Sequence, residues 1–221
     1  MAGAAVWRAT ADTAQVSAAR VLPDGCMDLI WADDALMVAG PDTTAHLTAW
    51  RPGRDYVGLR FAPGTGPTIL GVAAHELRDQ RVGLAHLWPA GRVRRLTEHV
   101  AAAPRRGVAL EEIAFGRLRR VEPPDPAILA AVDRLRAGAT VAATAAAVGM
   151  GERHLYRRCL AALGYGPKTL ARILRMNRAL AMSRAGIPPA TVAAEAGYAD
   201  QPHLAREVRS LTGVPLSVLT P

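Results

Sequence analysis

The chain has 221 residues, of which 50% are hydrophobic, and its formal net charge is +8. This length is sufficient for one large domain or for two small domains with separate cores. No charge-free apolar run approaches the roughly 18 residues of a membrane span, and the N-terminus lacks a basic segment followed by an apolar one, so we expect a cytoplasmic protein.

Strand and turn patterns alternate in the first part of the chain. Short runs of apolar and β-favouring residues are separated by turn signals such as Pro23-Asp24-Gly25 and Gly40-Pro41. We expect strands at 26–31, 35–39, 45–50 and 56–61. Such a series predicts a small antiparallel sheet or barrel.

Helical periodicity follows after residue 67. We expect helices at 68–71, 73–78, about 89–102 and 108–118. The run Val121-Glu-Pro-Pro-Asp-Pro126 then denies helical hydrogen bonds and favours an extended backbone. The predicted organisation is a β-rich domain with trailing helices at 1–120, a linker at 121–126 and an all-α domain at 127–221, which makes the fold class α+β.

Two segments of the C-terminal part repeat each other at an offset of 48 or 49 residues. Each has a short helix that ends at a glycine, a second helix with a Leu-x-Arg pattern, and a closing Gly-Pro pair. The matched features are Ala145-x-x-x-Gly149 with Ala193-x-x-x-Gly197, Leu155-x-Arg157 with Leu204-x-Arg206, and Gly164-x-x-Pro167 with Gly213-x-Pro215. The pattern predicts two helix-turn-helix units, at about 140–163 and 189–211, joined by a helix at about 168–184.

Positive charge is concentrated in the same region. Residues 127–221 contain 12 basic and 5 acidic residues, a net charge of +7, whereas residues 1–126 contain 15 and 14, a net charge of +1. Solvated helical faces are often basic, but an excess located on paired helix-turn-helix units indicates a surface that contacts phosphates.

The segment from about Ala127 to Leu219 resembles the double helix-turn-helix domain of the AraC/XylS family of bacterial transcription regulators. The resemblance is carried by Ala193-x-x-x-Gly197-Tyr198-x-Asp200-Gln201-x-His203-Leu204-x-Arg206 and by Gly213-x-Pro215. It implies a sequence-specific DNA-binding protein with two recognition helices and double-stranded DNA as the partner to expect. RNA polymerase is a further candidate partner. Leu204, Val208 and Cys159 stand where the family usually has aromatic residues.

Several side chains of the two second helices are candidates for DNA contact. We expect contact from Arg153, Tyr156 and Arg157 in the first unit, from Gln201, Pro202, His203, Arg206 and Arg209 in the second, and from Arg172 between them. Arg suits guanine and Gln suits adenine. The alternatives are an intramolecular salt bridge for Arg157, a capping or packing role for His203, and a solvated position for Arg172.

The N-terminal part resembles a poorly characterised β-rich domain that is often fused to this DNA-binding domain. The residues that carry this resemblance are Arg20-Val-Leu-Pro-Asp-Gly-Cys-Met-Asp-Leu-Ile-Trp31 and Val57-Gly-Leu-Arg-Phe-Ala-Pro-Gly64. Two functions remain open for this domain. It either senses a small molecule, with Trp7, Trp31, Trp50 and Phe61 as candidate pocket residues, or it forms a homodimer or contacts polymerase through the helices at 85–118.

An enzyme is not expected. The six histidines form no close pair with metal-ligand spacing, no Cys-x-x-Cys occurs, and we expect no catalytic residue, metal or cofactor. A regulator that accepts alkyl groups on cysteine needs several N-terminal cysteines, and here Cys26 stands alone between Asp24 and Asp28, which should raise the pKa of its thiol. A structural role for Cys26 is the favoured interpretation.

Overall fold

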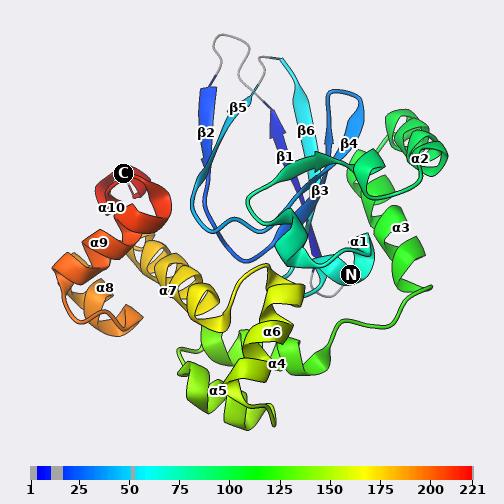
Figure 1. The fold of residues 1–221 in the computed structure, drawn as a ribbon. Coiled ribbons are helices and arrows are strands. Elements are labelled where there is room, and N and C mark those ends of the chain that lie inside the picture. Colours follow the sequence, from blue (N-terminus) through cyan, green and yellow to red (C-terminus); the bar gives the residue numbers. More distant parts are fainter. Residues whose placement is uncertain (1–3, 11–16, 51–52, 221) are drawn as a thin grey trace.

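The computed structural model describes residues 4–10, 17–50 and 53–220. An N-terminal β-rich part with three helices lies beside a C-terminal part that is built from helices alone (Figure 1). Each part has its own hydrophobic core, and the two cores comprise residues between 27 and 114 and residues between 128 and 211. The α+β fold class predicted from the sequence is confirmed.

Five strands form one antiparallel sheet in the order β1-β6-β3-β4-β7, and β2 pairs with β5 in a second sheet. The strands are β1 (Ala4–Thr10), β2 (Ser17–Val21), β3 (Met27–Ala32), β4 (Ala35–Ala39), β5 (His46–Trp50), β6 (Asp55–Phe61) and β7 (Arg81–Gly83). Of the two predicted alternatives, the described strands form open sheets and no closed barrel. The strand patterns in the sequence predicted β3 to β6 but not β1, β2 or β7.

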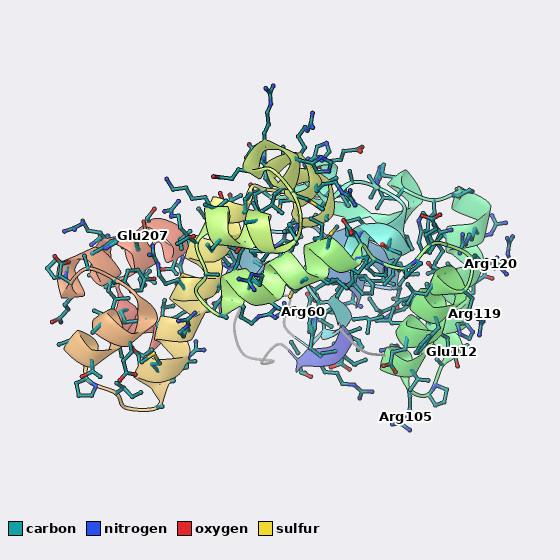
Figure 2. All side chains as sticks on the ribbon, turned by 90° about the horizontal axis from the view of Figure 1, so that it is seen from below. Arg60, Arg105, Glu112, Arg119, Arg120 and Glu207 are labelled. Atoms are coloured by element: carbon teal, nitrogen blue, oxygen red, sulfur yellow. The ribbon has the colours of Figure 1, made fainter. Side chains whose placement is uncertain are left out.

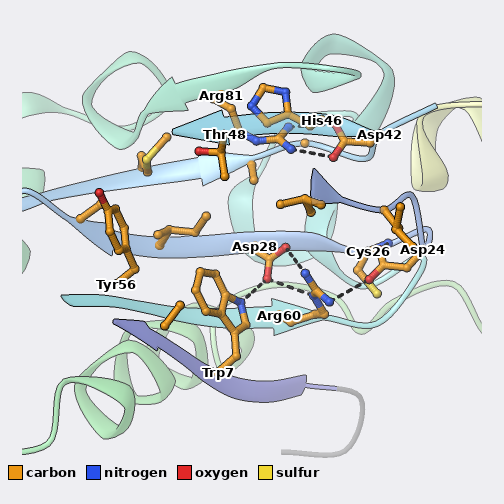
Figure 3. A pocket seen from close by; sticks show the side chains of 18 residues that line it. Trp7, Asp24, Cys26, Asp28, Asp42, His46, Thr48, Tyr56, Arg60 and Arg81 are labelled. Atoms are coloured by element: carbon orange, nitrogen blue, oxygen red, sulfur yellow. Dashed lines mark hydrogen bonds and ion pairs between the residues drawn. The ribbon is translucent and has the colours of Figure 1, made fainter. Parts of the chain in front are cut away.

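The two faces of the large sheet differ in chemistry because alternate side chains point to opposite sides. One face packs against the helices α1 (Gly66–Leu70), α2 (Ala90–Ala102) and α3 (Arg106–Leu118). Leu29, Val38 and Leu59 form the centre of this packing and are fully buried. The other face carries polar side chains and is partly covered by the β2–β5 pair (Figure 3).

The C-terminal part contains two helix-turn-helix units around one long helix. After α4 (Pro126–Arg136), the helices are α5 (Val141–Ala147), α6 (Glu152–Leu163), α7 (Pro167–Arg184), α8 (Pro189–Ala196), α9 (Gln201–Thr212) and α10 (Leu216–Leu219). α7 connects the first unit to the second (Figure 1). Its buried side chains, including Leu170, Ile173 and Met176, join both units into one core.

The two parts of the chain are in direct contact. Gly164, at the end of α6, lies so close to Pro41 that a β-carbon would be 2.5 Å from the proline ring. His75 Nδ1 lies 3.3 Å from the Leu160 carbonyl oxygen, and Asn177 Nδ2 on α7 donates to the Pro23 carbonyl oxygen at 3.0 Å. The N-terminal part therefore contacts both α6 and α7.

Candidate nucleic-acid interface and N-terminal cavity

The first unit presents one face of α6 to solvent. The Thr140 hydroxyl caps α5 by accepting a hydrogen bond from the Ala143 amide at 3.2 Å, and Gly149 supplies the left-handed turn (φ +68°). Leu155 anchors α6 in the core and is fully buried. The side chains of Arg153, Tyr156 and Arg157 are exposed. The sequence therefore places these three candidates on one accessible face.

Arg153 and Arg157 have no ion pair or hydrogen bond among the described residues, so both guanidinium groups are available to a ligand. Arg158, the next residue, instead pairs with Asp125, which also caps α4. Tyr156 is 49% exposed, and its ring lies on Gly166, where a β-carbon would be 2.4 Å away. The glycine thus orients the Tyr156 ring beside the start of α7.

The second unit has a similar construction, but its side-chain cap is on the second helix. Gly197 ends α8 in the left-handed conformation (φ +85°), and Asp200 caps α9 by accepting from the His203 amide at 2.6 Å. Leu204 and Val208 are buried in the core. The exposed residues of α9 include Gln201, Pro202, Ala205, Arg206 and Arg209.

The side chain of His203 is held within the unit. Its Nδ1 atom accepts a hydrogen bond from the Ala199 amide at 3.3 Å, and its ring meets the Tyr198 ring edge-on with 5.3 Å between centroids. His203 is half-buried, whereas Arg206 and Arg209 are exposed and have no ion pair among the described residues. The geometry supports packing and capping for His203.

Arg172, a candidate for phosphate contact, forms an ion pair within the chain. Its Nε and Nη2 atoms donate to the two oxygens of Glu207 at 2.9 and 3.1 Å, which ties α7 to α9. Glu207 lies on α9 (Figure 2). Arg175 lies 3.6 Å from the same carboxylate and stacks over the Tyr198 ring at 4.5 Å. Partial burial acts to raise the pKa of Glu207, but hydrogen bonds and charges from Arg172 and Arg175 hold it below its ordinary value. The Arg172–Glu207 pair fixes the orientation of the second unit on α7.

Replacing Arg172 with alanine should lower the free energy of unfolding by about 1 kcal/mol, because the bidentate pair is partly exposed and therefore screened. We expect the dependence of DNA affinity on salt concentration to stay unchanged. Urea unfolding and DNA titrations at two salt concentrations test both statements. A shallower salt dependence in the variant would show that Arg172 contacts a phosphate.

A cavity of about 330 Å³ lies between the polar face of the large sheet and the β2–β5 pair (Figure 3). Its residues come from all seven described strands and from the loops that follow β2 and β4. They are Trp7, Ala9, Val21, Leu22, Asp24, Cys26, Asp28, Ile30, Ala32, Met37, Ala39, Gly40, Asp42, His46, Thr48, Tyr56, Arg60 and Arg81. This volume is in the range of pockets that hold small molecules.

A charged network forms one side of the cavity because Asp28 and Arg60 are paired in register across β3 and β6. Arg60 Nε donates to Asp28 at 3.1 Å, and Arg60 Nη1 lies 2.9 Å from Asp24 (Figure 3). The Trp7 indole also donates to Asp28, at 2.6 Å. Burial raises the pKa of Asp28 above its ordinary value, although the charge of Arg60 opposes this effect.

Of the aromatic residues predicted to line a pocket, Trp7 lies at the cavity. Trp31 and Phe61 do not line it: they are 2% and 0% exposed and pack in the core on the opposite face of the sheet. The side chain of Trp50 lies outside the described residues. Alternation explains the difference, because Asp28 and Arg60 point away from the face that their apolar neighbours occupy.

The five charged residues of the cavity were not among the site residues predicted from the sequence. They are Asp24, Asp28, Asp42, Arg60 and Arg81. A signal was available, because Asp28 and Arg60 interrupt otherwise apolar strands, and charged residues are rarely buried without a partner. Cys26 is half-buried at the cavity, and burial, followed by the charge of Asp24, raises the pKa of its thiol. This environment disfavours a reactive thiolate.

Comparison with known families supports the assignment of the C-terminal helices. A family model described as a helix-turn-helix domain matches residues 144–220. These residues form a helix-turn-helix domain of the AraC type. The chain is a DNA-binding transcription regulator. A second model, described as a domain of unknown function (DUF6597), matches residues 4–83.

Similarity to solved structures extends over both parts of the chain. Apo ToxT K231A from Vibrio cholerae strain SCE256 has a TM-score of 0.51 and 10% identity, over 99% of this chain and 97% of that chain. The C-terminal domain of AraT, a response regulator from Geobacillus stearothermophilus, has a TM-score of 0.41 and 19% identity, over 43% of this chain and 84% of that one. The comparison with curated protein sequences gives no match. The likeness to ToxT concerns the fold alone.

Two features are absent from the described residues. None of the helices in the described ranges combines the length and hydropathy of a membrane span. No group of three or more His, Cys, Asp or Glu residues in those ranges has the arrangement of a metal site.

Proposed function

We propose that the regulator reads DNA with α6 and α9, which enter two successive major grooves on one face of the duplex. The single observation that carries this proposal is the presence of two capped helix-turn-helix units with four exposed arginines that have no partner among the described residues. Arg153 and Arg157 lie on α6, and Arg206 and Arg209 lie on α9. Major-groove entries that face the same side are separated by about one turn of DNA, or about 34 Å.

The two half-sites are read by different means. α6 presents two arginines and a tyrosine, which suit guanine edges, thymine methyl groups or phosphates. α9 presents Pro202 and Ala205, which read bases poorly, next to Gln201 and Arg206. The second half-site therefore depends more on phosphate contacts and DNA shape. A base-substitution scan with sharper preferences under α9 than under α6 would contradict this division.

Selection of binding sites from genomic DNA, followed by affinity measurements at two salt concentrations, tests the proposed function. If two to four of the unpaired arginines on α6 and α9 contact phosphates, affinity should fall roughly 10-fold to 150-fold between 50 and 200 mM salt, given a slope of about 0.9 per phosphate contact. The selected sites should contain two half-sites about one helical turn apart. A DNA affinity that depends on neither salt concentration nor DNA sequence would contradict the proposed DNA-binding function.

We also propose that the N-terminal cavity binds a small-molecule effector that modulates DNA binding. The segments that line the cavity also contact the second unit. On β2, Arg20 donates to the Thr212 carbonyl oxygen at 2.6 Å, and the Ala45 amide before β5 donates to the Leu211 carbonyl oxygen at 2.7 Å. A ligand that displaces the β2–β5 pair would therefore act directly on the end of α9.

A cavity-filling variant tests the effector proposal. Small molecules that raise the melting temperature of the full chain should also change its affinity for DNA, and Ala9→Phe should remove both effects because Ala9 lines the cavity. Ala5→Phe is the matched control, since Ala5 lies on the same face of β1 but outside the cavity and is exposed. Ligands that still bind Ala9→Phe with unchanged affinity would place the effector elsewhere.

The alternative function, a protein contact through the N-terminal helices, has one supporting observation. Val108 and Phe115 on α3 are 39% and 42% exposed and lie two turns apart on one face. Light scattering of the full chain distinguishes the alternatives. A dimer that Phe115→Ser converts to a monomer would support the contact, and a monomer at all concentrations would exclude self-association.

A further inference from the structure

The charged groups of the N-terminal cavity do not balance. Among the described lining residues there are three carboxylates, of Asp24, Asp28 and Asp42, and two guanidinium groups, of Arg60 and Arg81. One negative charge is therefore in excess when His46 is neutral. The excess lies with Asp24 and Asp28, because these two carboxylates share the single guanidinium of Arg60.

Both guanidinium groups are already occupied. The Nη1 and Nη2 atoms of Arg81 donate to the two oxygens of Asp42 at 2.9 and 2.6 Å. The Nε and Nη2 atoms of Arg60 donate to Asp28, and its Nη1 atom pairs with Asp24. An anionic ligand would have to break one of these ion pairs. By contrast, the carboxylates keep acceptor capacity, since each oxygen accepts two hydrogen bonds and Asp28 Oδ2 receives one weak bond, at 3.4 Å.

The other residues that line the cavity could contact the apolar part and the cationic group of a ligand. Ile30 and Met37 provide an apolar surface beside the carboxylates. The Trp7 and Tyr56 rings line the same cavity (Figure 3), and the Trp7 ring lies on Gly58, where a β-carbon would be 2.2 Å away. Gly58 thus allows the Trp7 ring to lie flat beside Asp28. Aromatic faces attract ammonium groups, most strongly at desolvated sites.

We propose that the cavity binds a small organic cation, an amine or quaternary ammonium whose charged group lies beside Asp24 and Asp28 and whose apolar part contacts Ile30 and Met37. This inference rests on the proposal that the cavity is an effector site, and it names the chemical class of the effector. Burial of Asp28 is consistent with this class, since a buried carboxylate with an incomplete set of partners gains from a cationic ligand.

Calorimetric titration of the full chain without DNA tests the ligand class with three probes of similar size. They are 2-phenylethylammonium, neutral 2-phenylethanol and anionic phenylacetate, with phenyltrimethylammonium as a second cation. We expect at least one cation to bind tenfold or more tightly than the alcohol and the anion. Asp28→Asn should weaken binding of that cation at least tenfold and leave binding of the alcohol unchanged. Asp133→Asn, which makes the same charge change at an exposed position on α4, should have no effect.

Each outcome supports or overturns the inference. If Asp28→Asn does not fold by circular dichroism, Asp24→Asn serves as the second variant, with the same expected loss. Equal affinity for cation and alcohol, tighter binding of phenylacetate, or no binding of either cation at millimolar concentration would overturn the ligand class. DNA binding is measured on the same preparations. If DNA binding remains sequence-specific while the cations do not bind, only the proposed ligand class is wrong. If sequence-specific DNA binding is absent, the proposed DNA-binding function is wrong.

Discussion

Replacing Arg153 with alanine should weaken binding to the selected DNA site by about 1–3 kcal/mol and relax the base preference at one position under α6. Arg153 lies on the exposed face of α6, near the start of the helix, with no partner among the described residues. A bidentate contact between arginine and guanine has this magnitude, and recognition helices contact bases mainly through their N-terminal residues. Competition titrations with the selected site and its single-base variants measure both effects.

Arg94→Ala is the control for the loss of charge, because Arg94 is exposed on α2 in the N-terminal part. It should leave affinity and base preference unchanged. A loss of affinity in Arg153→Ala that is uniform across all base variants, with a salt slope reduced by about 1, would assign Arg153 to a phosphate and not to a base. No loss at all would remove α6 from the proposed interface.

Replacing Gly40 with alanine should destabilise the protein by about 1–3 kcal/mol or more, the usual cost of overpacking. A β-carbon at Gly40 would lie 1.7 Å from the Leu77 carbonyl oxygen, and backbone atoms cannot move aside as a flexible side chain can. The Gly40 amide also donates to the Gln80 carbonyl oxygen at 2.9 Å, which holds the two segments together. Urea unfolding measures the change.

Replacing Gly116 with alanine should change the free energy of unfolding in the opposite direction. Gly116 lies inside α3, and a β-carbon there meets no atom within 4 Å. Alanine should therefore stabilise the protein by about 0.5–1 kcal/mol through helix propensity. If both variants have equal stability, the close approach of Gly40 to Leu77 does not exist in solution.

The C-terminal units were predictable from sequence because each depends on local signals. Thr140 and Asp200 cap their helices, and Gly149 and Gly197 end helices in the left-handed conformation. Each of these caps and turns involves residues that are close in sequence, so its formation does not depend on distant parts of the chain. Helix periodicity likewise predicted the exposed face of α6 from the position of buried Leu155.

The N-terminal sheet was predicted less completely. β1 and β7 are edge strands, and β2 pairs with β5 alone, so their sequences need not be strongly apolar. The cavity residues were missed for a related reason. Trp31 was predicted to line a pocket, but the polar side of its strand faces the cavity and Trp31 is in the core with α1 to α3. Aromatic residues in a strand mark the buried face of a sheet more often than a binding face.

By itself, the sequence determined the class of this protein, its two helix-turn-helix units and the side chains that they expose, because caps, turns and helical periodicity act over short distances. Only the tertiary structure decided that Arg172 binds Glu207, that Asp28 and Arg60 meet across two strands, and that β2 contacts the end of α9. Each of these contacts joins residues at least 32 positions apart. Such pairs depend on strand register and helix packing, which local patterns do not specify.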